Sequence, residues 1–253
     1  MGTFRFKRFE VKNEKAAMKV NTDGVLLGAV APLKASDEAI LDIGTGTGVI
    51  ALMLAQRLQE MKVNADATMD KTRILGIDID KGASEEAREN FLASPWTKAL
   101  TCMEAGLDEL DRKDDGLRYD LIVSNPPYYD SSLTNPDGRK TTARHTGSPD
   151  QGCGLSFREV LDFAGRRLEE DGRVAIVLPA DQETSLLRHG RMCGLHPISI
   201  LRIRTVERKA PIRIIVSFSR ERRHTEEHLL TIMEKGEYTM QYISLTKDFY
   251  LFQ

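Results

Sequence analysis

Short apolar runs alternate with segments of helical periodicity along most of this chain of 253 residues. The clearest runs are residues 39–43, 73–77 and 119–123, and the amphipathic segments 48–60 and 83–93 lie between them. Strands that alternate with helices pair in parallel, and such a sheet needs helices on both of its faces. The pattern therefore predicts an α/β fold with a mostly parallel sheet of seven strands, preceded by a short helical arm.

The sequence divides into three parts. Residues 1–38 are expected to form the N-terminal arm, residues 39–220 the main domain, and residues 221–253 a tail packed on that domain. Residues 129–154 are dense in Pro, Gly, Asn, Ser and Asp and predict a loop, and so long a loop in a compact domain is usually functional or mobile. Further helices are expected at about 14–30, 157–169 and 182–193, and further strands at 99–103, 173–178, 198–206 and 212–219.

The composition excludes several classes of protein. The chain is 41% hydrophobic and 29% charged, and no apolar stretch is long enough to span a membrane, so we expect a soluble, cytoplasmic protein. The first ten residues carry no apolar segment behind their basic side chains, which argues against a secretory signal. Cys102, Cys153 and Cys193 lie far apart, without CxxC or His-Cys spacing. We expect reduced packing cysteines with no disulfide and no metal site, and we favour a monomer.

Two segments are basic although the whole chain has a net charge of −2. Residues 1–20 hold six basic side chains against two acids, and residues 201–223 hold eight against two. Either segment alone is explained by the solvated face of a helix or strand. Two basic segments on a mildly acidic chain nevertheless favour a polyanionic partner such as a nucleic acid.

A glycine-rich turn follows the first strand of the main domain, in the sequence Asp42-Ile-Gly44-Thr-Gly46-Thr-Gly48. Glycines at a strand-to-helix turn leave bare main chain against which a ligand can lie. The spacing is G-x-G-x-G and not the dinucleotide pattern G-x-G-x-x-G, in which the helix N-terminus receives a pyrophosphate. An acid before the first glycine suits the cationic amino group of S-adenosylmethionine better than a pyrophosphate, so NAD is the minor alternative.

A second acid, Asp78, ends the next predicted strand. A carboxylate at that place accepts hydrogen bonds from both ribose hydroxyls of an adenosine. A further acid is expected to meet the adenine after the third strand, but Gly106 stands there. A backbone amide, or Glu104 or Asp108 displaced in the sequence, could serve instead.

The tetrapeptide Asn125-Pro126-Pro127-Tyr128 follows the fourth strand. The prolines stiffen the turn, so that the Asn125 side-chain oxygen and the Pro126 carbonyl are presented as acceptors. Two such acceptors can hold both hydrogens of a planar amino group and direct its lone pair at a sulfonium methyl group. Pro127 and Tyr128 offer a surface on which a planar substrate can stack. The alternative, a rigid strand-end turn without function, is the weaker hypothesis at this position.

The combination of the glycine turn with Asn125–Tyr128 resembles the amino methyltransferases of the Rossmann-like class. Within that class, residues 6–27, 143–146 and 238–251 are similar to the bacterial tRNA1(Val) (adenine-37-N6)-methyltransferase family. The resemblance covers nearly the whole chain. It implies a Rossmann-like methyltransferase fold, S-adenosylmethionine as cofactor, and methylation of the adenine beside the anticodon of a valine tRNA.

The resemblance also implies that Thr22 contacts the cofactor and that Asp23 lies beside the substrate. Arg144, in the long loop, is a candidate contact to a tRNA phosphate, for which a loop ion pair is the plain alternative. The Asn-Pro-Pro-Tyr motif alone is shared with glutamine methyltransferases of release factors and with rRNA guanine methyltransferases. Glutamine methyltransferases normally carry a large N-terminal helical domain, so the short arm favours a nucleic acid. An inactive nucleic-acid-binding protein is a third hypothesis, which the intact Asn125 and Asp78 oppose.

Overall fold

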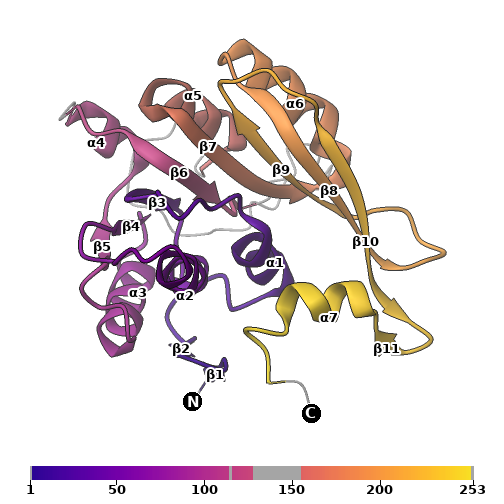
Figure 1. Cartoon of the computed structure of the whole chain (residues 1–253), viewed down its shortest axis with the longest axis horizontal. Coiled ribbons are helices and arrows are strands. Elements are labelled where there is room, and N and C mark those ends of the chain that lie inside the picture. The colour runs from indigo at the N-terminus through magenta and orange to yellow at the C-terminus, as the bar shows by residue number, and fades with distance from the viewer. Residues whose placement is uncertain (1, 114–115, 128–154, 252–253) are drawn as a thin grey trace, which may run out of the picture.

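A mixed sheet of nine strands forms the centre of the molecule (Figure 1). The computed structural model describes residues 2–113, 116–127 and 155–251. Within these residues, the strands follow the order β11-β10-β8-β9-β7-β6-β3-β4-β5. A separate hairpin, β1 and β2, lies at the N-terminus, and none of the helices in these ranges is long and apolar enough to cross a membrane.

The strands of the main sheet are β3 (Ala39–Ile43), β4 (Arg73–Asp78), β5 (Leu100–Glu104), β6 (Tyr119–Ser124), β7 (Leu168–Pro179), β8 (His196–Val206), β9 (Arg213–Ser219), β10 (Glu226–Glu234) and β11 (Glu237–Tyr238), and the hairpin strands are β1 (Thr3–Arg5) and β2 (Glu10–Lys12). The strands predicted within residues 39–220 lie close to these positions, except that β7 begins at Leu168 and not at residue 173. The sequence did not predict β10, β11 or the hairpin strands. The helices are α1 (Thr22–Val30), α2 (Val49–Asn64), α3 (Lys81–Ala93), α4 (Leu107–Arg112), α5 (Phe157–Arg167), α6 (Glu183–Met192) and α7 (Met240–Thr246), with a 3-10 turn at Ala180–Gln182.

Apolar side chains on both faces of the central strands explain why this sheet is buried. Ile40 and Val123 point into a core shared with α1 and α2, whereas their neighbours Leu41 and Ile122 point into a core shared with α5 and α6. Successive strand residues face opposite sides of a sheet, so a continuous apolar run fills both cores. Figure 1 shows the two helical layers, and helices on both faces are as predicted.

Seven strands come from residues 39–220, as predicted, and pair mostly in parallel. The exception is β9, which runs antiparallel to both β7 and β8. Residues of the tail add β10, which pairs in parallel with β8, and the short β11. The predicted loop at 129–154 lies outside the described residues, and the division of the chain at residues 38 and 220 stays a prediction.

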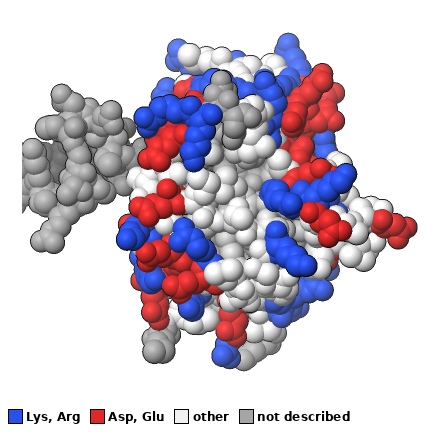
Figure 2. All heavy atoms as spheres, turned by 90° about the vertical axis from the view of Figure 1, so that its left-hand side faces the viewer, with Lys and Arg blue, Asp and Glu red and all other residues white. Residues whose placement is uncertain are grey.

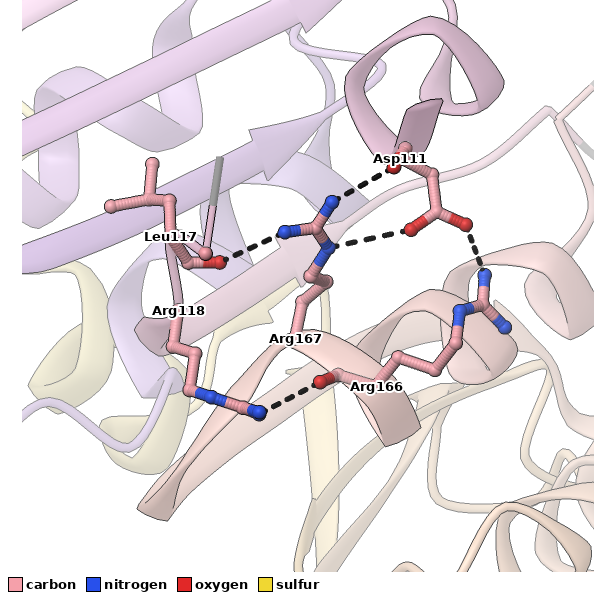
Figure 3. Close-up of a pocket in the computed structure, with 6 residues that line it drawn as sticks. Asp111, Leu117, Arg118, Arg166 and Arg167 are labelled. Atoms are coloured by element: carbon pink, nitrogen blue, oxygen red, sulfur yellow. Dashed lines mark hydrogen bonds and ion pairs between the residues drawn. The ribbon is translucent and has the colours of Figure 1, made fainter. Parts of the chain in front are cut away.

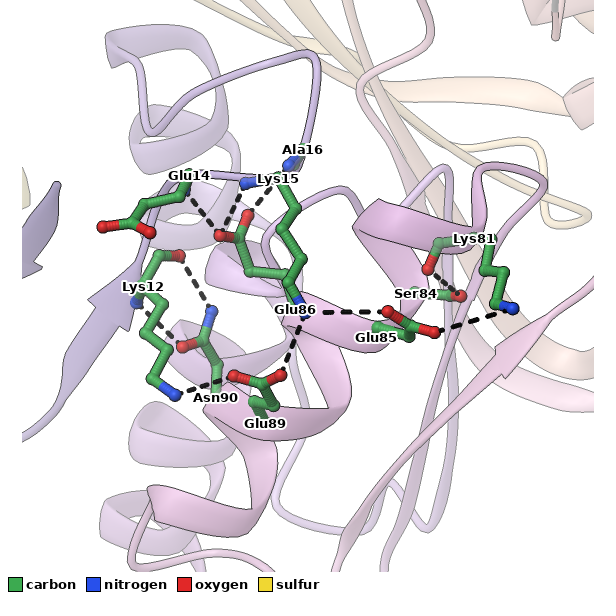
Figure 4. A network of polar contacts seen from close by, with 10 residues as sticks. All are labelled: Lys12, Glu14, Lys15, Ala16, Lys81, Ser84, Glu85, Glu86, Glu89 and Asn90. Atoms are coloured by element: carbon green, nitrogen blue, oxygen red, sulfur yellow. Dashed lines mark hydrogen bonds and ion pairs between the residues drawn. The ribbon is translucent and has the colours of Figure 1, made fainter. Parts of the chain in front are cut away.

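The helix of the N-terminal arm is shorter than the sequence predicted, because it begins at Thr22 and not near residue 14. The carboxylate of Glu86, on α3, accepts hydrogen bonds from the backbone N–H groups of residues 14, 15 and 16 at 2.5–2.9 Å (Figure 4). Those N–H groups hold the segment in an irregular path across α3. The helix starts only where Asn21 caps it, accepting from the Gly24 N–H at 2.9 Å.

A second side chain of α3 ties the arm to the glycine turn. Asn90 accepts from the Lys12 N–H at 2.8 Å and donates to the Thr47 carbonyl, also at 2.8 Å. It is 2% exposed, so these bonds are shielded from water. The arm and the turn are therefore held in one fixed arrangement.

A buried ion pair joins the start of β3 to β7. The guanidinium of Arg173 donates to Asp37 at 2.6 Å, and the two side chains are 4% and 2% exposed. Arg173 also donates to the carbonyls of Pro32, after α1, and Asp120, in β6. One side chain of β7 thus links the segment before β3 and the strand β6, which are distant from it in the sequence.

Candidate active site

The carboxyl ends of β3 and β6 bring the glycine turn and the Asn-Pro-Pro segment together. These two strands are neighbours, with Ile43 opposite Ser124, and the Ser124 hydroxyl donates to the Ile43 carbonyl at 2.8 Å. The chain leaves β3 toward β4 on one side and reaches β6 on the other, which makes this the switch point of the sheet. Ligands of open α/β sheets bind at such points.

The glycine turn has the strained backbone that its sequence predicts. Gly44, Gly46 and Gly48 have φ angles of 71°, 55° and 79°, in the left-handed region that side chains disfavour. The space above Gly46 is open, because a Cβ placed there would meet only the Met18 carbonyl, at 3.9 Å. A flat ligand can therefore lie directly on this main chain.

Asp42 is fully buried beneath the turn. Its Oδ2 accepts a hydrogen bond from the Thr45 hydroxyl at 2.7 Å, while Oδ1 has no hydrogen-bond partner among the described residues. Burial raises the pKa of this carboxyl to about 7, against the opposing effect of the Thr45 hydroxyl. A buried acceptor without a donor fits the cationic amino group of the cofactor predicted for this site.

Asp78 ends β4 beside the turn, as predicted. Its Oδ2 accepts from the Gly46 N–H and its Oδ1 from the Asp80 N–H, both at 2.9 Å. These bonds fix the carboxylate while leaving a further lone pair on each oxygen. Burial raises the pKa of Asp78, and the two backbone hydrogen bonds oppose this shift. The geometry fits a carboxylate that holds two vicinal hydroxyls.

Two side chains lie beside Gly106, and which group meets the adenine stays a prediction. A Cβ at Gly106 would lie 2.6 Å from Oδ1 of Asp108 and 3.4 Å from the Ile79 side chain. The Asp108 carboxylate therefore folds back into the space beside Gly106, as one of the considered alternatives requires. Ile79 is 63% exposed although it is apolar, and sequence reasoning did not single it out. Together they offer a polar edge and an apolar surface for an adenine ring.

Asn125 is 7% exposed at the end of β6. Its amide Nδ2 donates to the sulfur of Met18 at 3.3 Å, which fixes the plane of the amide. Met18 belongs to the arm segment held by Glu86 and was not identified from the sequence, where an isolated methionine carries no signal. Pro126 is buried and Pro127 is half-buried, so both are in place beside Asn125.

Thr22 and Asp23 begin α1, at the end of the arm segment that carries Met18. Thr22 is exposed, and Asp23 forms an ion pair with Arg213, at the start of β9, with 2.8 Å between Oδ2 and Nε. Arg213 is a residue of this region that sequence reasoning counted only as part of a basic segment. Tyr128 and Arg144 lie outside the described residues, and all of these ligand assignments remain predictions.

The two basic segments differ in the structure. In the first, Arg5, Arg8, Lys12 and Lys15 all pair with glutamates, and the two partners of Lys12 and Lys15 lie on α3. Figure 2 views the molecule from the side of α3 and α4, and positive and negative side chains are mixed over that face. These ion pairs explain the basic side chains of the first segment as part of an ordinary solvated surface.

The second basic segment is split between opposite edges of the sheet. Exposed Arg208 and Lys209 lie in the turn after β8, at the edge where β6 ends in Asn125. Exposed Arg222 and Arg223 follow β9, at the other edge. Only the first pair shares an edge with the candidate site.

A surface pocket of about 320 Å³ lies at that other edge, away from the glycine turn (Figure 3). Arg118 donates to the carbonyl of Arg166, and Arg167 donates to the carbonyl of Asp111, both at 2.8 Å. Arg166 also pairs with the Asp111 carboxylate. These arginines bind the carboxyl ends of α4 and α5. Their charges therefore stabilise the fold, and the pocket gives no indication of a ligand.

Comparison with known proteins agrees with the geometry. Residues 22–141 match the family model of the methyltransferase small domain. A tRNA1(Val) (adenine(37)-N6)-methyltransferase of Flavobacterium johnsoniae is 40% identical over 98% of this chain and 99% of its own. A relative of the same name from Bacteroides fragilis is 39% identical over 98% of this chain and 97% of its own.

Among solved structures, a predicted O-methyltransferase from Agrobacterium tumefaciens superposes with a TM-score of 0.61 at 16% identity, covering 90% of this chain and 96% of its own. This likeness confirms the Rossmann-like methyltransferase fold. The protein is thus an S-adenosylmethionine-dependent methyltransferase, as its sequence indicated. The identity over nearly the full length shows, further, that the chain belongs to the tRNA1(Val) (adenine(37)-N6)-methyltransferase family.

Proposed function

We propose that this protein methylates N6 of an adenine in tRNA, and that the adenine is position 37 of tRNA1(Val), as in the names of its relatives. The observation that carries the proposal is the pairing of Ile43 with Ser124, which puts Asn125 beside the glycine turn. A tRNA substrate places the activity in the cytoplasm, and the protein acts as a monomer. The arm, main domain and tail, divided near residues 38 and 220, form one working unit.

The cofactor supplies an electrophilic methyl group on a sulfonium. Asp42 holds its amino group, Asp78 its ribose hydroxyls, and Gly44 and Gly46 provide the main-chain surface beneath it. Thr22 covers the mouth of this site from the N-terminus of α1. The orphaned Oδ1 of Asp42 and the open space above Gly46 support these assignments.

Asn125 and Pro126 act on the substrate. The side-chain oxygen of Asn125 and the carbonyl of Pro126 accept the two N6 hydrogens, which turns the nitrogen lone pair toward the methyl group. Met18 receives the Asn125 Nδ2–H and so keeps the amide oxygen on the opposite side. Positive charge develops on N6 as the bond forms, and the two acceptors stabilise it. The proton leaves afterwards, so no strong base is needed.

Pro127 and Tyr128 stack on the extruded adenine, and Asp23 borders the place where the base enters. Arg144 contacts a phosphate of the anticodon loop. An adenine that is taken out of its loop in this way presents both faces and its amino edge to the protein.

The test is mass spectrometry of nucleosides from bulk tRNA of a strain that lacks this gene. We expect N6-methyladenosine to fall and to be restored by the wild-type gene but not by Asn125→Ala. In vitro, an unmodified tRNA1(Val) transcript should be methylated, whereas the same transcript with guanine at position 37 should not. An unchanged tRNA profile together with an unmethylated release factor would instead favour a glutamine methyltransferase.

A further inference from the structure

Three side chains with metal-binding atoms meet where α6 ends against α5, remote from the candidate active site. His189 lies on α6, Cys193 caps its C-terminus, and Asp162 comes from α5. Oδ1 of Asp162 lies 2.9 Å from Nε2 of His189 and 3.1 Å from Sγ of Cys193. The three ligand atoms all lie within 4.8 Å of one another. Bonds to zinc of about 2.0–2.3 Å require ligand atoms about this close.

The backbone holds these three side chains in place. The Cys193 N–H donates to the His189 carbonyl at 3.1 Å, so the i and i+4 side chains share one face of the helix end. Gly165 lets α5 approach, because a Cβ there would meet the Cys193 carbonyl at 2.9 Å. On the other side, a Cβ at Gly190 would meet the Phe218 ring at 2.6 Å, so α6 is seated closely on β9. The site is built on packed elements and needs no loop to form it.

The three groups lie close to the surface, so that an ion bound among them would have one position open to water. The His189 side chain is 12% exposed, whereas that of Asp162 is 48% exposed. Nδ1 of His189 is buried without a hydrogen-bond partner in the described parts of the chain, so Nε2 is the ring nitrogen that faces the other two groups. An ion among the three would meet protein on the inner side and water on the outer side.

We propose that Asp162, His189 and Cys193 form a binding site for Zn²⁺, with a water molecule as the fourth ligand. One thiolate, one imidazole and one carboxylate are a borderline-soft donor set that suits zinc, whereas Mg²⁺ and Ca²⁺ prefer oxygen ligands alone. The expectation of no metal site rested on the separation of the cysteines from one another. It also took the chain to lack His-Cys spacing, whereas His189 and Cys193 stand four residues apart at the end of α6.

Binding releases one proton to solvent and moves another within the His189 ring. In the metal-free protein, the Cys193 thiol and the His189 ring both hydrogen-bond to Asp162. Zinc takes the lone pairs of Sγ and Nε2, the thiol proton is released to solvent, and the ring proton resides on Nδ1. The ion then joins α5 to α6 by direct bonds in place of the two hydrogen bonds.

The test uses the full-length protein, freed of metal by a chelator and then dialysed against ZnCl₂. We expect one zinc per chain, with affinity measured by competition with a chromophoric chelator. Asp162→Asn, His189→Gln and Cys193→Ser should each weaken binding by more than about 100-fold, since even outer-shell partners of metal sites contribute 10–100-fold. His228→Ala is the matched control, because His228 lies 3.7 Å from Glu226 on an exposed strand and should bind as the wild type does.

Substitution with Co²⁺ tests the thiolate directly. The cobalt protein should show a sulfur-to-metal charge-transfer band that disappears in Cys193→Ser and persists in Cys102→Ala and Cys153→Ala. Cys193→Ser keeps a donor for Asp162, and its melting temperature without metal checks that it folds. Zinc should raise the melting temperature of the wild type but not of this variant. The proposal would be overturned if the protein bound no zinc, or if Cys193→Ser left the zinc and cobalt signals unaltered. The three side chains would then serve only to hydrogen-bond α5 to α6.

Discussion

The cofactor half and the substrate half of the candidate site are built in different ways. Apart from Thr22 of α1, the cofactor half comes from two adjacent parallel strands and the glycine turn that follows the first, and its carboxylates lie only 36 positions apart, at Asp42 and Asp78. The substrate half combines Met18 of the arm, Asn125 at the end of β6 and Arg213 at the start of β9. The main residues of the cofactor half are close in the sequence, whereas those of the substrate half are distant in the sequence and are brought together by the fold.

This difference predicts how the halves respond to change. The cofactor half is held by backbone hydrogen bonds, such as those from Gly46 and Asp80 to Asp78, and it should survive changes elsewhere. The substrate half depends on side-chain contacts between distant segments, such as Asp23 with Arg213. Changes there should alter turnover and leave cofactor affinity nearly constant.

The largest effect is expected for Asn125→Ala. It removes the acceptor for one N6 hydrogen, so the rate of methyl transfer should fall by at least about 100–1,000-fold. Cofactor affinity, measured by calorimetry, should stay within a few fold of the wild type. Ser124→Ala is a useful comparison, because it removes the bond to Ile43 but keeps Asn125. Normal turnover by Asn125→Ala would refute the proposed mechanism.

Asp37→Ala tests the buried ion pair that joins the segment before β3 to β7. It leaves the guanidinium of Arg173 buried without its carboxylate, so the free energy of unfolding should fall by about 3–5 kcal/mol. Urea denaturation measures the loss. Asp171→Ala, which removes the 93% exposed partner of Lys34, should cost less than about 1 kcal/mol. Equal losses in the two variants would mean that burial of the Arg173–Asp37 pair adds nothing to its contribution to stability.

Asp42 predicts a pH dependence confined to the cofactor half. Its pKa is about 7, so between about pH 4 and pH 7 the folded, cofactor-free protein keeps a proton on Asp42 that the unfolded chain has released. The contribution of Asp42 to stability therefore falls as the pH rises through this range. A bound cationic amino group favours the ionised carboxylate. Cofactor affinity should therefore rise about fivefold from pH 6 to pH 7. Calorimetry at both pH values measures this, and Asp42→Asn should remove the difference. A rise that persisted in this variant would assign the titration to another group.

The smallest effect is expected from surface charge on the substrate side. Reversing Arg208 and Lys209 to glutamate should weaken tRNA binding several fold and lower its salt dependence by about one to two units. The same reversal at Arg222 and Arg223, on the opposite edge, is the matched control and should change little. Filter binding over a range of salt concentrations measures both. Equal effects would show that the RNA does not approach along the edge that holds Asn125.

Sequence reasoning predicted the cofactor half better than the substrate half. Glycine spacing and strand-end acids are local signals, so Asp42, Gly46 and Asp78 could be placed before the fold was known. Met18 and Arg213 could not, because their positions depend on contacts across more than 100 residues of sequence. The helix expected from residue 14 was wrong for the same reason. Its backbone donors are taken by Glu86, a side chain about 70 positions away.

The Ser124 hydroxyl, which binds the Ile43 carbonyl at the heart of the sheet, has a further consequence for heat inactivation. In the proposed mechanism, the residues that hold the cofactor and the amino group stand at the ends of adjacent strands of one sheet. The distance between them cannot drift unless those strands part, and that requires the sheet itself to unfold. On warming, the enzyme should therefore keep its full catalytic rate up to the unfolding transition and then lose it all at once, with no intermediate range of slow turnover.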